Sequence, residues 1–118
     1  MKSVFAGFFV ALLAVFPAAP RAQDYPAKPI RFVVPYPPGA LTDVLARAIA
    51  QVAPKYFSQP LVVVNKPGGG AIPGRVDVAR SKADGYTLLW GTSSGLVINP
   101  LLFRSLSFAP QRDLAPIA

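Results

Sequence analysis

The sequence of 118 residues contains no cysteine, no histidine and no glutamate. Without cysteine, the chain can form no disulfide bond and can offer no thiolate nucleophile. Without histidine, it lacks the commonest general base and the commonest metal ligand. The acidic residues are five aspartates scattered along the chain, a pattern that does not favour a carboxylate cage around a metal ion. These absences argue against an enzyme, and they predict no catalytic residue, no metal site and no cofactor.

Negative charge is scarce relative to positive charge. Twelve Lys and Arg residues stand against the five aspartates, which gives a formal net charge of +7. The basic residues occur singly rather than in clusters, so we do not expect a nucleic-acid partner. A mildly cationic surface that attracts anionic solutes is the better interpretation.

Residues 1–22 predict a secretory signal peptide. Lys2 provides a short positive start, residues 4–16 form an uncharged apolar run, and residues 17–22 are mostly small. The apolar run is shorter than the roughly 20 residues that span a bilayer, which makes an uncleaved membrane anchor the less favoured alternative. We therefore expect an exported protein whose mature chain begins near residue 23.

From residue 30 onward, the sequence predicts strands that alternate with helices. Runs rich in β-branched and aromatic residues predict buried strands over residues 30–34, 61–65 and 86–90. Helices are predicted over residues 41–53 and 73–81, with a short helix over 99–103 and a turn over 109–113. The expected inward face of the first helix is Leu41, Leu45, Ala48, Ile49, Val52 and Tyr56. This order predicts an α/β fold with a parallel sheet and right-handed crossovers.

The stretch from residue 35 to residue 43 predicts an anion-binding turn. Its prolines end the first strand, Gly39 allows a tight turn, Thr42 is the expected N-cap, and Asp43 suits the first helical turn. The first amides of a helix lack internal partners, so a carboxylate or phosphate can dock there. Ligands of parallel sheets sit outside the carboxyl ends of the strands, so we expect loops 35–41, 66–71 and 91–95 at one edge.

The glycine-rich loop after the second strand does not match a nucleotide-binding motif. Gly69 and Gly74 come close to the spacing of a phosphate-binding P-loop, but Arg75 and Val76 replace the Lys and the Ser or Thr that the motif requires. The glycine spacing of dinucleotide-binding proteins is also absent. A flexible connection between strand and helix is the favoured interpretation.

Taken together and in order, several segments resemble one protein family. They are Tyr25-Pro26-Ala27-Lys28-Pro29-Ile30, Val34-Pro35-Tyr36-Pro37-Pro38-Gly39, Thr42-Asp43, Gln59-Pro60-Leu61-Val62-Val63-Val64-Asn65-Lys66-Pro67-Gly68, Asp84-Gly85-Tyr86-Thr87-Leu88-Leu89, Gly91-Thr92-Ser93-Ser94 and Asn99-Pro100. In this respect the chain resembles the substrate-binding proteins of tripartite tricarboxylate transporters, the Bug family of periplasmic receptors. The resemblance covers nearly all of residues 24–118.

The resemblance implies a fold like that of type II periplasmic binding proteins, in which two α/β lobes close over a small organic acid without catalysis. It implies that residues 23–118 form the N-terminal part of the first lobe, truncated before the second, and that the full-length receptor is a monomer in the periplasm. The implied partners are a small di- or tricarboxylate and the membrane components of a tripartite transporter. The implied ligand-binding residues are Pro38, Gly39, Ala40, Leu41, Thr42, Asp43, Thr92, Ser93 and Ser94. A secreted α/β interaction module without a transport role remains the alternative.

Overall fold

The computed structural model describes residues 24–118, so the predicted signal peptide over residues 1–22 lies outside the described residues. The strands and helices are, in chain order, β1 (Ile30–Val34), α2 (Leu41–Val52), β2 (Leu61–Asn65), α3 (Ile72–Ala79), β3 (Thr87–Leu89), α4 (Asn99–Leu102) and α5 (Pro110–Asp113). Short helical turns join them: η1 (Ala53–Lys55), η2 (Gly69–Ala71) and the π-helical turn η3 (Ser94–Ile98). Among residues 24–118, no helix is long and apolar enough to cross a membrane.

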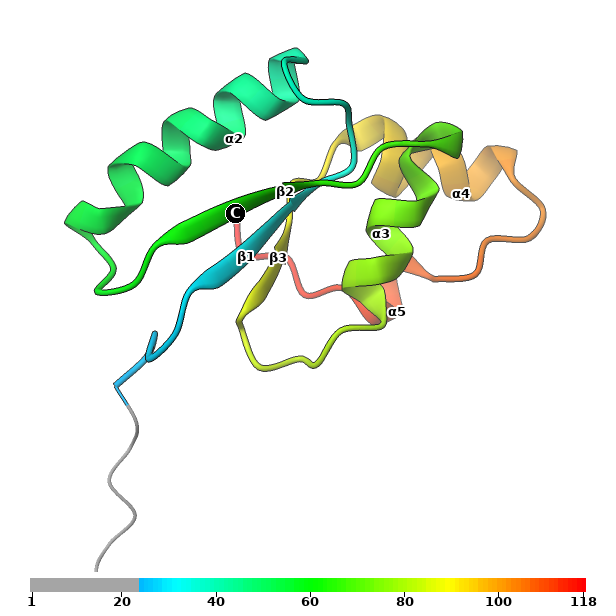
Figure 1. Ribbon diagram of the computed structural model, residues 1–118. Helices are drawn as coiled ribbons and strands as arrows, with labels where there is room; N and C mark the ends of the chain where they lie inside the picture. The colour runs from blue at the N-terminus through cyan, green and yellow to red at the C-terminus, as the bar shows by residue number, and fades with distance from the viewer. Residues whose placement is uncertain (1–23) are drawn as a thin grey trace, which may run out of the picture.

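The three strands form a parallel sheet in the order β2-β1-β3, which confirms the predicted α/β fold. Ile30 of β1 lies opposite Leu61, and Arg31 lies opposite Thr87. The crossover from β1 to β2 runs in one direction across the sheet and that from β2 to β3 in the other. Right-handed connections therefore place α2 and α3 on opposite faces of the sheet (Figure 1).

The core centres on β1 because this strand has a neighbour on each side and a helix over each face. Phe32 and Val34 pack with Ala46 of α2 in the buried cluster. On the α3 side, the Arg31 guanidinium pairs with Asp77, which explains how a charged residue interrupts a buried strand. The Lys66 ammonium lies 2.8 Å from the other oxygen of Asp77, so the carboxylate is paired twice.

The predicted inward face of α2 is wrong. The residues that face the sheet are Asp43, Ala46 and, beyond the helix, Ala53, while Leu45 and Ile49 are 45% and 48% exposed. Small alanines let the helix approach the sheet closely, and the larger apolar side chains then lie along its flank. With Trp90 and others they line a shallow apolar groove of about 490 Å³.

The C-terminal segment differs from the prediction in one element. Residues 110–113 form the helical turn α5 rather than a simple turn. Pro110 suits the first helical position because that residue needs no hydrogen-bond donor. The Asp113 carboxylate accepts a hydrogen bond from the Ala109 amide at 2.8 Å, which caps the turn.

Candidate functional site

The loops that follow the three strands meet at the carboxyl edge of the sheet, as predicted. The Tyr36 hydroxyl, after β1, lies 2.8 Å from the Thr92 hydroxyl, after β3. The Lys66 amide, after β2, donates to the Val34 carbonyl at 2.9 Å. After β1, the chain continues to α2 on one face of the sheet. After β3, it continues to η3, which packs against α3 on the opposite face. The gap between β1 and β3 is thus a switch point, where ligands of such sheets bind.

The first helix begins one residue earlier than its predicted cap. Ala40 is the N-cap, in an extended conformation (φ −66°, ψ 157°), and α2 starts at Leu41, so the assignment of Thr42 as N-cap is wrong. Thr42 lies inside the helix with its hydroxyl buried and without a partner among residues 24–118. Gly39 adopts φ +82°, a left-handed conformation that side chains disfavour, and this lets the proline turn close.

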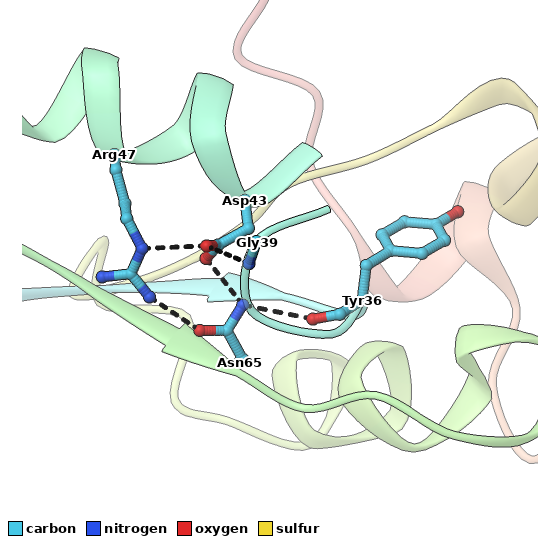
Figure 2. Close-up of polar contacts among 5 residues, drawn as sticks. All are labelled: Tyr36, Gly39, Asp43, Arg47 and Asn65. Carbon is cyan, nitrogen blue, oxygen red and sulfur yellow. Dashed lines mark hydrogen bonds and ion pairs between the residues drawn. The ribbon is translucent and has the colours of Figure 1, made fainter. Parts of the chain in front are cut away.

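Asp43 organises this turn through a set of four residues that we call the Asp43 clamp: Gly39, Asp43, Arg47 and Asn65 (Figure 2). One carboxylate oxygen of Asp43 accepts hydrogen bonds from the Gly39 amide and the Arg47 guanidinium, both at 2.9 Å. The other accepts from the Asn65 side-chain amide at 2.8 Å. Asn65 also donates to the Tyr36 carbonyl at 3.1 Å and accepts from Arg47 at 2.9 Å.

In the clamp, the negative charge of Asp43 is compensated by the positive charge of Arg47. The hydrogen bond from Arg47, together with those from Gly39 and Asn65, keeps the pKa of Asp43 far below its ordinary value. Asp43 is therefore ionised at neutral pH, paired with Arg47 and 3% exposed. Its carboxylate fixes the loop and is occupied on both oxygens. The amides of Leu41 and Thr42 have no acceptor among residues 24–118, and they remain the unpaired donors at this helix end.

The loop after β3 contributes two of its three predicted hydroxyls to a shared cluster. The Thr92 hydroxyl lies 3.0 Å from that of Ser94 and 2.8 Å from that of Tyr36. Ser93 is exposed and its side chain makes no hydrogen bond within residues 24–118. Tyr36 was not among the predicted site residues, although its position in the proline turn between Val34 and Gly39 places it there.

Arg75 of α3 is the second residue that the sequence analysis missed. Its side chain is fully buried, with one guanidinium nitrogen donating to the Gly70 carbonyl at 2.8 Å. Another nitrogen donates to the hydroxyls of Tyr36 and Thr92, each at 3.3 Å. Its spacing from the apolar Val78 and Ala79, three and four residues on, is the signal that could have placed it on the inner face of α3. We call Arg75, Tyr36, Thr92 and Ser94 the Arg75 cluster.

A second hollow on the described residues lies elsewhere. A wide depression of about 1010 Å³ is lined mainly by residues of α3 and by residues at the amino ends of β1 and β3. Three of its five cations have partners, since Arg31 and Lys66 pair with Asp77 and Lys28 lies 3.8 Å from Asp84. The other two, Arg80 and Lys82, are exposed to solvent and pair with no carboxylate among residues 24–118. We assign the candidate site to the carboxyl edge of the sheet, because parallel sheets bind ligands at a switch point and, among residues 24–118, backbone amides without acceptors lie there.

The model of the tripartite tricarboxylate transporter family receptors matches residues 45–118 of the chain. The chain belongs to this family. Protein BugT of Bordetella pertussis is 42% identical over 114 residues, which are 95% of this chain and 34% of that protein. This chain therefore spans about a third of the length of the curated relatives it matches.

Solved structures of this receptor family share the fold of the chain. MatC from Rhodopseudomonas palustris, solved with bound malate, superposes with a TM-score of 0.72 at 31% identity, over 75% of this chain and 30% of that one. A second R. palustris protein, solved with adipate, gives a TM-score of 0.70 at 34% identity, over 75% and 29%. Both bound compounds are dicarboxylates.

Proposed function

We propose that this chain is part of a solute-binding receptor that holds a small carboxylate and delivers it to the membrane components of a tripartite transporter. The observation that carries the proposal is the meeting, at one switch point, of an open helix start and a hydroxyl cluster backed by a buried cation. Within the described part of the chain, the amides of Leu41 and Thr42 have no acceptor, and the dipole of α2 adds partial positive charge to them. Both features favour an anion.

The predicted ligand-binding residues remain part of this proposal, with different roles. Leu41 and Thr42 offer backbone amides, and Pro38, Gly39 and Ala40 shape the turn that exposes them. Asp43 holds the turn rather than the ligand, because both of its oxygens are occupied. Thr92 and Ser94 face the ligand with their hydroxyls, and Ser93 lies between them.

The family and its solved members support a dicarboxylate as the ligand class, since adipate and malate are bound in two of them. In this proposal, residues 1–22 are a signal peptide, residues 23–118 belong to the first of two lobes, and the mature receptor is a periplasmic monomer. Mass spectrometry of a periplasmic extract should find a chain that starts near Gln23. Recovery of intact Met1 in the membrane fraction would contradict the export step.

Ligand binding should be measured by calorimetry on the protein expressed from its complete gene, with malate and adipate and with a neutral diamide as a control compound. We expect saturable binding of a dicarboxylate and none of the diamide. Gly39→Val should weaken binding more than Thr87→Val, because a side chain at Gly39 meets no neighbour within 4 Å but cannot easily keep φ +82°. Equal affinities of the two variants at matched stability would argue against the helix start as the anion site.

A further inference from the structure

Arg75 carries a charge that nothing in the described chain neutralises. Its side chain has no exposed surface, and no carboxylate of residues 24–118 lies within ion-pair distance of it. One guanidinium nitrogen, Nε, has no hydrogen-bond partner among these residues. Burying an unpaired cation costs free energy, because the protein interior solvates charge poorly. Such a group is a candidate for a role in binding rather than in folding.

The chain makes specific room for this cation. A Cβ added at Gly95 would overlap the guanidinium of Arg75, so only glycine leaves space for it at this position of η3. At the residue before Arg75 in α3, a Cβ at Gly74 would lie 2.8 Å from Pro35 and 2.9 Å from the Lys66 carbonyl. Two glycines thus allow Arg75 to lie pressed between the loops that follow β1 and β3.

The hydrogen atoms of the cluster can be counted. The hydroxyl oxygen of Thr92 lies within hydrogen-bond distance of the Arg75 guanidinium and of the hydroxyls of Tyr36 and Ser94. Thr92 has a single hydroxyl hydrogen, so it can be the donor in only one hydrogen bond. Arg75 is always the donor, so Thr92 accepts from one hydroxyl neighbour and donates to the other. The three hydroxyls form two hydrogen bonds with one another, Tyr36–Thr92 and Thr92–Ser94, and these use two of the three hydroxyl hydrogens. One hydrogen is left to donate outside the cluster, from Tyr36 or Ser94.

We propose that Arg75 is a positioning residue that makes this site selective for anions, because it polarises the hydroxyls of Tyr36, Thr92 and Ser94 toward a ligand carboxylate. The inference rests on the proposed function and adds to it the residue that sets charge preference. Arg75 contacts no ligand in this scheme. Its positive charge strengthens the outward hydroxyl donor and offsets the ligand charge across a short, poorly screened distance.

The state of Tyr36 agrees with this polarisation. Burial raises the pKa of the Tyr36 phenol, whereas its hydrogen bond with Thr92 and the charge of Arg75 lower it, and the lowering prevails. The phenol is thus a better donor than an ordinary tyrosine. Phenols are also stronger acids than alcohols, which favours donation in the order Tyr36 to Thr92 to Ser94. This order leaves the outward hydrogen on Ser94, which is exposed.

The test compares three variants in the protein expressed from its complete gene: Arg75→Gln, Arg75→Lys and Arg80→Gln. Arg80→Gln removes the same charge from an exposed position near the end of α3 and serves as the matched control. Calorimetry with succinate and with neutral succinamide measures the charge preference. Titration of Tyr36, followed as the difference between each protein and its Tyr36→Phe version, measures the polarisation without any ligand. Urea unfolding confirms that each variant is folded.

We expect Arg75→Gln to weaken succinate binding by about tenfold or more, since one poorly screened charge is lost, with little effect on succinamide. Arg75→Lys should recover most of the loss, and Arg80→Gln should match the wild type. The pKa of Tyr36 should rise in Arg75→Gln alone. If no wild-type binding is found, the proposed function fails, and the Tyr36 titration still decides the inference. An unchanged Tyr36 pKa in Arg75→Gln, or equal succinate affinity at full folding, would overturn it.

Discussion

Tyr36 lies between two polar clusters of opposite character. Its carbonyl accepts a hydrogen bond from Asn65 of the Asp43 clamp, while its ring extends away from the clamp (Figure 2). Its hydroxyl accepts a hydrogen bond from Arg75 in the Arg75 cluster. In the clamp, anion and cation are paired, and both Asp43 oxygens have donors. In the Arg75 cluster, among residues 24–118, the cation pairs with no carboxylate and one hydroxyl hydrogen has no acceptor.

This difference indicates that the Asp43 clamp stabilises the structure of the site, whereas the Arg75 cluster determines which ligand it can bind. A satisfied network rigidifies the turn, and its loss should damage folding. A network with unmet donors gains from a ligand that supplies acceptors, and its loss should change ligand preference. The loop of six residues between β1 and α2 joins the two clusters, because it contains Gly39 of the clamp and Tyr36 of the Arg75 cluster.

A large loss of stability should come from closing the space above Arg75. Gly95→Ala places a methyl group where the guanidinium lies, and overpacking of this kind costs about 1–3 kcal/mol. The same substitution in an Arg75→Ala background should cost little, because the overlap is gone. Urea unfolding of the two single variants, the double variant and the wild type measures this coupling. Additive costs would mean that Gly95 and Arg75 do not meet as the structure has them.

Removal of the clamp should lower stability without altering ligand preference. Asn65→Ala removes two donated hydrogen bonds and leaves a buried carboxylate oxygen of Asp43 unpaired, a loss of about 2–3 kcal/mol. Asn99→Ala is the matched control, since Asn99 donates a single hydrogen bond to the Gly70 carbonyl. Thermal unfolding gives the stabilities, and calorimetry gives the ratio of succinate to succinamide affinity. A changed ratio in Asn65→Ala would show that the two clusters are not separable.

Much of this arrangement could be predicted from sequence, for reasons that are local. The three buried runs predict strands because their side chains suit a doubly covered sheet, and the prolines and Gly39 predict the turn. Parallel order then brings the loops to one edge. The N-cap of α2 was predicted two residues too late, at Thr42 instead of Ala40, because Thr is a common capping residue. In the structure, the Asp43 carboxylate instead accepts a hydrogen bond from the Gly39 amide.

The remaining errors have non-local causes. The role of Asp43 depends on Asn65, which lies 22 residues later, and the burial of Arg75 depends on a missing side chain at Gly95. Neither pairing leaves a pattern within one element. The inner face of α2 was misjudged because size and hydrophobicity favour Leu45 and Ile49, while close approach to the sheet favours Ala46. The distance between α2 and the sheet decides which residues face inward, and the periodicity of the sequence does not reveal that distance.

The dependence of the free energy of unfolding on acidic pH offers a further way to test the clamp. The folded-state pKa of Asp43 is depressed, so its contribution is present above the unfolded value near 3.8 and is lost as the pH falls below it. Asp43→Asn should therefore lower the urea midpoint most at neutral pH, and the gap to wild type should narrow below about pH 4. Asp24→Asn removes an exposed carboxylate and is the control. A gap that stays constant with pH would indicate that the ion pair contributes nothing.

The smallest expected effect distinguishes two neighbouring serines. Ser94 lies 3.0 Å from Thr92 at the exposed end of the Arg75 cluster, whereas the Ser93 side chain makes no hydrogen bond within residues 24–118. Ser94→Ala removes one outward donor, so succinate binding should weaken by about fivefold, the value of one net hydrogen bond near 1 kcal/mol. Ser93→Ala should bind as the wild type does, and neither variant should shift the urea midpoint because both serines are exposed. Equal losses in the two variants would mean that the loop contributes by its shape, and that the outward hydrogen does not belong to Ser94.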